Sequence, residues 1–347
     1  MLNTMNFKLL KSLSEVAGPS GFETRIREMI INEIKADVDS VTTDNMGNLV
    51  AFRKGKSDKK LMIAAHMDEI GFIVTHIDDN GFLKFATLGG FDPKTLTAQR
   101  VIVHGKKDVI GVMGAKPIHV MTPEERDKKV TVKDFFIDLG MTKQEVDEII
   151  EVGTPISRER ECIEMGSCIN GKSLDNRIAV YILIETIKQL KNKELPFDTY
   201  FTFTVQEEVG LRGAQVAALN IQPDYAIALD TTIAYDVPGS CPQEQITKLG
   251  EGPGIKIMDS SVICHAGFVA FMKSVAQKNN IPFQAEIMQG GGTDTSMLQK
   301  MVAGGAIAGA VSIPTRHLHQ VIESVHKDDV ENSIRLLSCI TDSIDTI

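Results

Sequence analysis

The sequence predicts an α/β protein, a mixed sheet flanked by helices, with a small β-domain inserted into it. Three apolar runs, 61–65, 201–205 and 225–229, have the character of buried strands, and segments with helical periodicity lie beside them. From residue 72 to residue 165 the pattern changes to short alternating strands about turns. We therefore expect a discontinuous sheet domain, formed by 1–71 and 166–347, around an inserted domain at 72–165.

The N-terminal part is predicted to be helical. Residues 6–16 have helical periodicity, and a Gly-Pro-Ser-Gly break separates them from a second helix over 23–36. Ser20 and Glu23 have the spacing of a capping box at the start of that helix. Residues 38–55 then have the pattern of two strands about a turn, which leads into the first buried strand.

The insert is predicted from its turn and strand patterns. Asn80-Gly81 is the strongest kind of short hairpin signal, and residues 100–115 have the pattern of a second strand pair. A capping box formed by Thr142 and Glu145 predicts a short helix before a strand at 153–157. These patterns together indicate a small β-domain.

Alternating helices and strands resume after residue 171. Residues 173–191 have the apolar stripe of a helix, and strand-like runs recur up to residue 313. In open α/β sheets, ligands bind in the crevice beyond the carboxyl ends of the strands. Residues that follow the strands are therefore the candidates for a functional site.

Composition limits the partners of this protein. Lys+Arg 37 against Asp+Glu 46 gives a net charge of -9, which disfavours a polyanion, so we expect no nucleic-acid partner. We also expect no membrane partner and a cytoplasmic location, because no segment approaches the length of a membrane span and the N-terminal stretch lacks an apolar signal region. The five cysteines contain no CxxC pair, which fits reduced thiols.

Carboxylates and histidines stand where the buried strands end. A histidine and an acid follow the first strand, two adjacent glutamates follow the second, and an aspartate ends the third. Another aspartate opens the helix at 173–191, and a histidine follows the last strand. The set comprises His66, Asp68, Asp175, Glu207, Glu208, Asp230 and His319. These residue types are those of a dinuclear metal site.

The residue types suggest a division of roles. Asp175 would bridge two metals, each of which would have two further protein ligands and one open position. The four single-bond ligands would be His66, Glu208, Asp230 and His319. Two dications outweigh three ligand carboxylates, so a hydroxide that bridges the metals is expected at neutral pH. Glu207, which on an extended backbone faces away from Glu208, would be the general base, and Asp68 would orient the ring of His66.

Each residue also has an ordinary structural explanation when it is taken alone. Adjacent glutamates after a strand are most often a solvated turn, and Asp175 and Asp230 are equally well explained as helix caps. A glycosidase would need two carboxyl groups that flank one bond, which adjacent residues supply poorly. The joint pattern favours the metal site.

Two segments leave alternatives open. Both His317 and His319 follow the last strand, and only one of them need face the site. Residues 289–294 include three consecutive glycines and form either a tight turn or a wall where the backbone approaches substrate closely. The sequence does not decide between these alternatives.

Six segments carry a resemblance to a known family. In chain order they are AAHMDEIGF, SLDNR, VQEEVGLRGA, ALDTT, GGGTD and PTRHLH. These segments and their order resemble the tetrahedral aminopeptidase family of dinuclear metallopeptidases, which includes glutamyl and deblocking aminopeptidases. The resemblance covers essentially the whole chain.

The resemblance implies a function and an assembly. It implies two zinc or cobalt ions held by the five ligands named above, with Glu207 as the base, in a fold similar to the zinc peptidases. It also implies that the insert, similar to a PDZ-like module, mediates dimerisation and that six dimers form a dodecamer. The expected activity is release of N-terminal residues from short peptides, and a deacylase or carboxypeptidase on the same metal core is the alternative.

Overall fold

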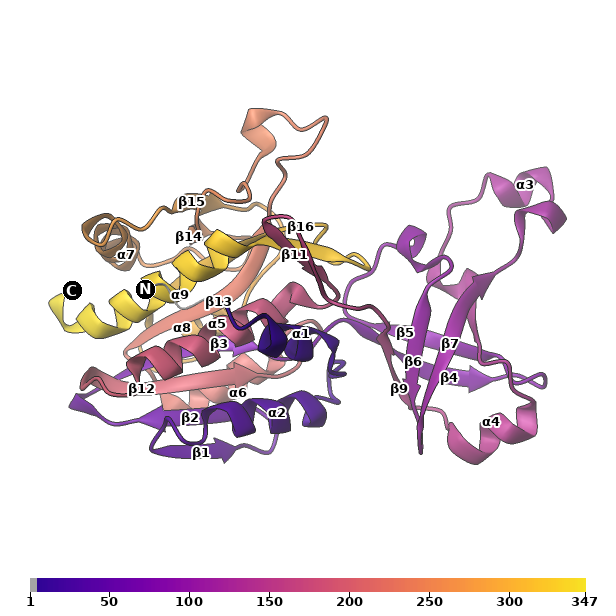
Figure 1. The fold of residues 1–347 in the computed structure, drawn as a ribbon, viewed down its shortest axis with the longest axis horizontal. Helices are drawn as coiled ribbons and strands as arrows, with labels where there is room; N and C mark the ends of the chain where they lie inside the picture. Colours follow the sequence, from indigo (N-terminus) through magenta and orange to yellow (C-terminus); the bar gives the residue numbers. More distant parts are fainter. Residues whose placement is uncertain (1–4) are drawn as a thin grey trace.

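The computed structural model describes residues 5–347 and contains an eleven-stranded mixed sheet (Figure 1). Nine strands lie in the order β1-β2-β12-β3-β13-β16-β17-β11-β10, and β14 joins β16 to β15. The bounds are β1 Ser40–Thr43, β2 Leu49–Arg53, β3 Gly55–His66, β10 Ile163–Met165, β11 Cys168–Gly171, β12 Leu195–Thr204, β13 Tyr225–Ile233, β14 Gly254–Met258, β15 Gln284–Ile287, β16 Ile307–Arg316 and β17 Glu323–His326. The central pairs β12–β3, β3–β13 and β13–β16 are parallel, so their carboxyl ends share one edge.

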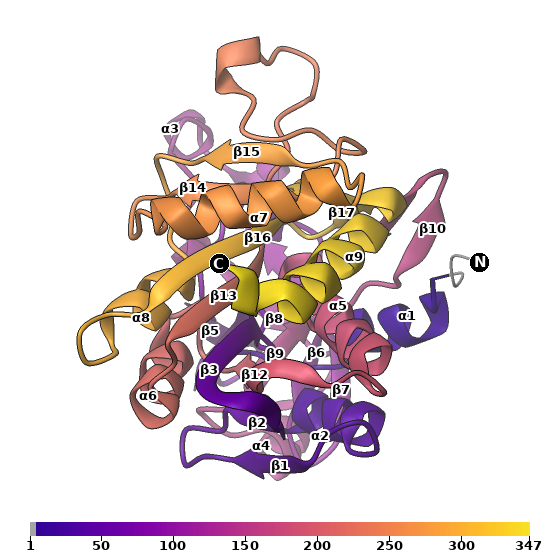
Figure 2. The same ribbon diagram turned by 90° about the vertical axis from the view of Figure 1, so that its left-hand side faces the viewer.

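Helices cover both faces of this sheet, as Figure 2 shows: α5 and α9 lie on one side, and α6 and α8 lie on the other. The helices are α1 Phe7–Glu15, α2 Thr24–Ile34, α3 Pro123–Arg126, α4 Lys143–Ile149, α5 Leu174–Leu190, α6 Arg212–Ile221, α7 Ala266–Lys278, α8 Thr295–Lys300 and α9 Lys327–Ser343. Strand β3 is buried throughout its last six residues because both of its faces are covered, which explains its unbroken apolar run. None of the described helices combines the length and apolar character that a bilayer span requires.

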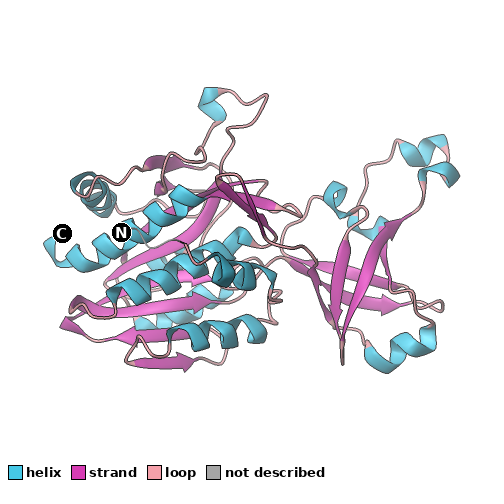
Figure 3. Cartoon of the chain, viewed as in Figure 1, coloured by secondary structure: helices cyan, strands magenta, loops and turns pink. Residues whose placement is uncertain are grey.

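Between β3 and β10 the chain forms a closed antiparallel barrel, which Figure 3 shows apart from the large sheet. Its strands follow the order β4-β5-β8-β7-β6-β9, with bounds β4 Gly71–Ile77, β5 Leu83–Leu88, β6 Arg100–His104, β7 Asp108–Ala115, β8 Phe135–Asp138 and β9 Pro155–Arg158. The barrel has its own apolar core, which includes Phe72, Val101 and Ile137. A mixed sheet with helices and a small β-barrel is the fold class that the sequence predicts, and this prediction is confirmed.

Of the three local predictions made from turn and capping residues, two are confirmed and one is wrong. The hairpin at Asn80-Gly81 is confirmed, because β4 and β5 pair antiparallel around it. The capping box of Thr142 and Glu145 at the start of α4 is also confirmed. The predicted capping box of Ser20 is wrong: α2 begins at Thr24 with no side-chain cap, because the Ser20 hydroxyl donates to the buried Asp68 carboxylate instead, at 2.7 Å.

A buried ionic cluster joins the end of β3 to the start of α5. Glu69 accepts hydrogen bonds from Lys172 Nζ at 2.6 Å, from the backbone N–H of Gly18 at 2.9 Å and from the Ser173 hydroxyl. Arg177 lies 3.6 Å from the same carboxylate. Burial alone would raise the pKa of Glu69, but the charges of Lys172 and Arg177 lower it to about 2. The cluster is stable only as a complete set, since each charge is removed from water.

We expect Glu69→Ala to destabilise the protein by about 3–5 kcal/mol, because it leaves Lys172 and Arg177 buried without their counter-charge. The measurement is a urea titration of metal-free protein followed by circular dichroism. Glu194→Ala is the matched control, because Glu194 pairs with Lys56 at 3.1 Å on the surface and is 74% exposed. Equal unfolding midpoints for the two variants would contradict a stabilising role for Glu69.

Candidate metal centre

The register of the parallel strands brings the predicted site residues together. His66, the last residue of β3, lies opposite Thr204, the last residue of β12. On its other side Ala65 lies opposite Leu229, so Asp230 of β13 is adjacent to His66. The carboxyl ends of three strands therefore meet at one edge, as the sequence predicts for such a sheet.

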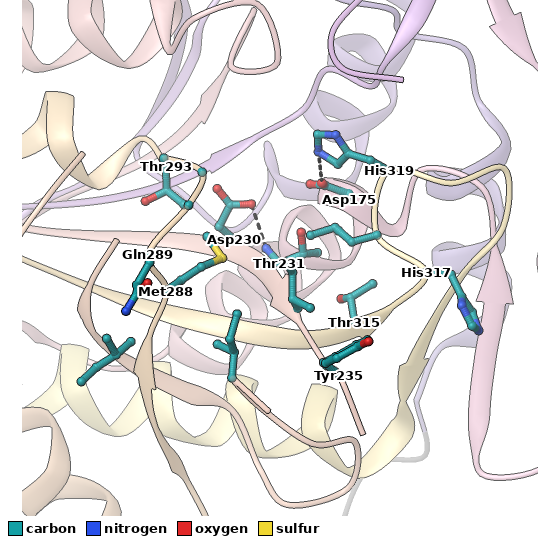
Figure 4. A pocket seen from close by; sticks show the side chains of 18 of the residues that line it. Asp175, Asp230, Thr231, Tyr235, Met288, Gln289, Thr293, Thr315, His317 and His319 are labelled. Carbon is teal, nitrogen blue, oxygen red and sulfur yellow. Dashed lines mark hydrogen bonds and ion pairs between the residues drawn. The ribbon is translucent and has the colours of Figure 1, made fainter. Parts of the chain in front are cut away.

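Asp175 stands between two histidines. Its Oδ1 lies 3.3 Å from Nε2 of His66, and its Oδ2 lies 3.2 Å from Nε2 of His319. A second carboxylate accompanies each histidine: Asp230 is 3.6 Å from His66, and Glu208 is 3.5 Å from His319. Figure 4 shows Asp175, Asp230 and His319 at the same end of a cavity. This arrangement places all five predicted ligands in one cluster.

The two adjacent glutamates reach different parts of this cluster. Glu207 Oε2 lies 3.9 Å from Nε2 of His66, whereas Glu208 accompanies His319. The expectation of an extended backbone here is wrong, because the Glu207 carbonyl accepts from the N–H groups of Gly210 and Leu211 in a turn. In this turn Glu207 lies nearer to His66, and Glu208 lies nearer to His319. His66, Glu207 and Asp230 present ligand atoms within 4.8 Å of one another, as do His66, Asp175 and Glu208.

Asp68 contacts His66 and the backbone of both glutamates without being one of the five predicted ligands. Its Oδ1 lies 3.4 Å from Nδ1 of His66 and accepts from the backbone N–H of Glu207 at 3.0 Å. Its Oδ2 accepts from the Ser20 hydroxyl at 2.7 Å and from the Glu208 N–H at 3.3 Å. Burial alone would raise the pKa of Asp68, but its contact with His66 lowers that pKa. One ionised carboxylate thus lies against a histidine ring and accepts hydrogen bonds from the backbone of both glutamates.

Sequence reasoning missed Glu323, a buried acid at the start of β17. Its Oε2 accepts from the Asp175 N–H at 2.9 Å, and its Oε1 accepts from the His319 N–H at 3.2 Å. Glu323 therefore fixes the backbone at two of the predicted ligands. The one available signal was a carboxylate inside an otherwise apolar strand pattern, four residues after His319.

The structure places the two segments for which the sequence left alternatives, residues 289–294 and the histidines at 317 and 319. Residues 289–293 line the cavity beside the cluster, so the glycine-rich segment forms a wall. His319 contacts Asp175, and His317 lines the same cavity; both have positive φ, 58° and 62°. Asp294, at the end of the glycine-rich segment, is buried and accepts from the Thr204 hydroxyl at 2.6 Å.

The electrostatics of the cluster favour bound cations. Burial raises the pKa of Glu208 to about 8, with a further contribution from the charge of Asp175. Burial also raises the pKa of Glu207 well above its ordinary value, and the charges of Asp230 and Glu208 add to the shift. Burial likewise raises the pKa of Asp294 to about 7. Crowded carboxylates of this kind repel one another, and divalent cations would remove the repulsion.

Hydrogen-bonding capacity in the cluster gives a direct test of whether metals fit. Oδ1 of Asp175 and Oε1 of Glu208 are buried and have no hydrogen-bond partner within the protein. Buried carboxylate oxygens are normally paired, whereas oxygens aimed at a metal are not. Histidine nitrogens and carboxylate oxygens are ligands that zinc and related metals accept. The residues therefore fit metal ions.

Comparison with known proteins identifies the family. A family model described as M42 glutamyl aminopeptidase matches residues 47–336. The chain belongs to the M42 aminopeptidase family. The predicted resemblance to tetrahedral (TET) and glutamyl aminopeptidases is confirmed, and so is the prediction of a metallo-aminopeptidase.

Individual relatives agree with this assignment over nearly their full length. This M42 aminopeptidase is 34% identical to the lysyl aminopeptidase of Pyrococcus furiosus, over 98% of each chain. A TET aminopeptidase from a marine sediment archaeon of the Thaumarchaeota superposes with a TM-score of 0.94 at 39% identity, over 97% of this chain and 95% of that chain. The TET1 peptidase of Pyrococcus horikoshii, which can assemble into a tetrahedron or a large octahedral shell, gives a TM-score of 0.87 at 35% identity, over 96% of this chain and 98% of that chain. A TET1 structure with the same TM-score and identity, matched over 97% of this chain and 99% of that chain, is a dodecamer.

We expect Asp175→Asn in this M42 aminopeptidase to lower the metal content. The neutral amide would bind metal ions less strongly than the carboxylate, whose two oxygens face two histidines. Elemental analysis of purified, zinc-reloaded protein measures the change. Asp58→Asn is the matched control, since the Asp58 side chain is 98% exposed. Full metal occupancy in Asp175→Asn would exclude Asp175 as a bridging ligand.

Proposed function

We propose that this protein is a dinuclear metal-dependent aminopeptidase that hydrolyses N-terminal residues from short peptides. The observation that carries the proposal is the position of Asp175, whose two oxygens face His66 and His319. Each histidine is accompanied by a further carboxylate, from Asp230 or from Glu208. This supports two neighbouring metal positions, with Asp175 as the shared ligand.

The metal-binding residues in this proposal are the five that the sequence predicts. His66 and Asp230 would hold one ion, His319 and Glu208 the other, and Asp175 would contact both. Zinc or cobalt suits this ligand set of imidazole and carboxylate groups. Two such ions, when bound, polarise the scissile carbonyl and acidify the attacking water.

The chain itself would supply the proton transfers. We assign Glu207 as the general base, because its carboxylate lies within 3.9 Å of His66 and its pKa is raised by burial, so that it can hold a proton. Glu207 Oε2 would take the proton from the attacking water and then pass it to the departing amine. Asp68 would keep the ring of His66 in position during this cycle.

The proposal also includes a cytoplasmic location and a homo-oligomeric assembly for this protein. All five cysteines are free thiols, which supports a reducing, cytoplasmic compartment. TET relatives form dodecamers and closed shells, which supports a homo-dodecamer built from dimers for this chain. The barrel would then mediate dimerisation, in keeping with its place outside the large sheet.

We expect Glu207→Gln to retain its metals but to lose turnover by about 10²- to 10⁴-fold, because the change removes a base and no ligand. Elemental analysis and hydrolysis of aminoacyl chromogenic substrates measure the two quantities. Glu208→Gln is the matched control and is expected to lose metal. Unchanged turnover in Glu207→Gln would remove it as the base, and lost metal would make it a ligand.

An N-acetylated control substrate separates the alternative reactions. Release of the chromophore from free-amine substrates alone supports the aminopeptidase. Release of acetate from the blocked substrate instead would favour a deacylase on the same metal core, and release of the C-terminal residue from a peptide would favour a carboxypeptidase.

We expect a native mass close to twelve times the 38.0 kDa of one chain, as for the dodecameric relative. Light scattering behind a sizing column measures this mass at several protein concentrations. A mass of two chains at every concentration would overturn the dodecamer and leave the dimer. Monomers throughout would overturn both.

A further inference from the structure

The cavity beside the candidate metal centre has both charged and neutral lining residues. It measures about 1450 Å³, and His66, Asp175 and Asp230 are among the residues that line it. The rest of its wall comes from the ends of β13, β15 and β16, from the segments that follow them, and from the turn before α6. The cavity is large enough for the first residue of a peptide together with part of the next. The residues that line the cavity would therefore contact the N-terminal side chain of a substrate and influence which residues are accepted.

No lysine or arginine occurs among the described residues that line this cavity. Outside the metal centre, the one lining carboxylate belongs to Glu244, which is exposed and accepts from the Cys241 N–H at 3.3 Å. A glutamate side chain in the cavity would thus find no lysine or arginine partner, and His317 is the one imidazole among the described lining residues outside the proposed metal ligands. A lysine side chain would find no buried counter-charge among these residues outside the metal centre. Enclosing either charge without a partner is unfavourable.

Exposed apolar side chains, rather than charged ones, line much of the cavity outside the metal centre. Ile233, Tyr235 and Ile287 line it and remain 37%, 40% and 51% exposed, although they are large apolar residues. Met288 and Val237 extend this apolar wall. Figure 4 shows Met288 and Tyr235 among the side chains around the cavity, together with Asp230 of the metal centre. Exposed apolar surface inside a concave site is typical of a pocket for an apolar group.

We propose that this cavity selects substrates with a neutral, apolar N-terminal side chain, such as leucine or methionine, over glutamate and lysine. The proposal rests on the proposed aminopeptidase function and specifies its substrate class. It separates this chain from its lysyl relative and from the glutamyl activity for which the family model is described. Two effects produce this selection: apolar side chains of the cavity favour an apolar substrate side chain, and the missing counter-charge disfavours glutamate and lysine.

The test compares kcat/KM of metal-loaded protein for leucyl, methionyl, glutamyl and lysyl p-nitroanilides. We expect leucyl or methionyl substrates to exceed both charged ones by about tenfold or more. Faster cleavage of the glutamyl or lysyl substrate would overturn the proposal and leave the aminopeptidase function intact. No cleavage of any free-amine substrate by protein with two bound metals would overturn both.

A charge introduced into the wall tests the location of the pocket. Ile287→Lys is expected to raise the ratio of glutamyl to leucyl kcat/KM by about tenfold or more, because it supplies the missing cation. Ile263→Lys is the matched control, since Ile263 is 71% exposed and does not line the cavity. An unchanged ratio in folded Ile287→Lys, or an equal change in the control, would overturn the assignment of this wall.

Calorimetric binding of free L-leucine, L-glutamate and L-lysine to the unmodified protein gives a readout that needs neither a variant nor turnover. We expect L-leucine to bind most tightly. Tighter binding of either charged amino acid would overturn the proposal.

Discussion

The two oxygens of Asp175 face two different histidines, and the rest of the centre is arranged around this one carboxylate. Such a position requires a fixed backbone at the start of α5, where Asp175 itself has non-helical dihedral angles. Glu323 meets this requirement by accepting the Asp175 N–H, and it fixes His319 through its second oxygen. The carboxylate that faces two histidines is therefore itself held in place by another carboxylate, through its backbone N–H.

The surroundings of the centre are polar but closed to water. Asp68, Glu69 and Glu323 are all fully buried, and each accepts several hydrogen bonds. Their networks continue toward the barrel, because Arg158 at the end of β9 donates to the Gln320 carbonyl and to the Ser173 hydroxyl. The loop that carries His319 and the junction between barrel and sheet are thus parts of one hydrogen-bonded unit. Buried polar groups that are hydrogen-bonded in this way favour a single arrangement of side chains.

The cavity combines this charged centre with a neutral wall. Carboxylates are concentrated where the central strands end, and exposed apolar side chains lie at the last residues of β13 and β15 and on the segments that follow them. The proposed metal centre and the proposed side-chain pocket therefore share one cavity. The glycine-rich segment adds to the wall, because its residues 289–293 line the cavity.

The sequence by itself determined the α/β sheet, the barrel hairpin at Asn80-Gly81 and the types of residue at the strand ends. These features are local: periodicity, turn residues and strand termini are written in adjacent positions. Only the tertiary structure decided the roles of Glu323 and Ser20, because Glu323 meets Asp175 across 148 positions of the chain and Ser20 meets Asp68 across 48. Ser20 has a local capping pattern, yet its hydroxyl binds the buried Asp68 carboxylate, since an ionised acceptor inside the protein forms a stronger hydrogen bond than a helix end near solvent.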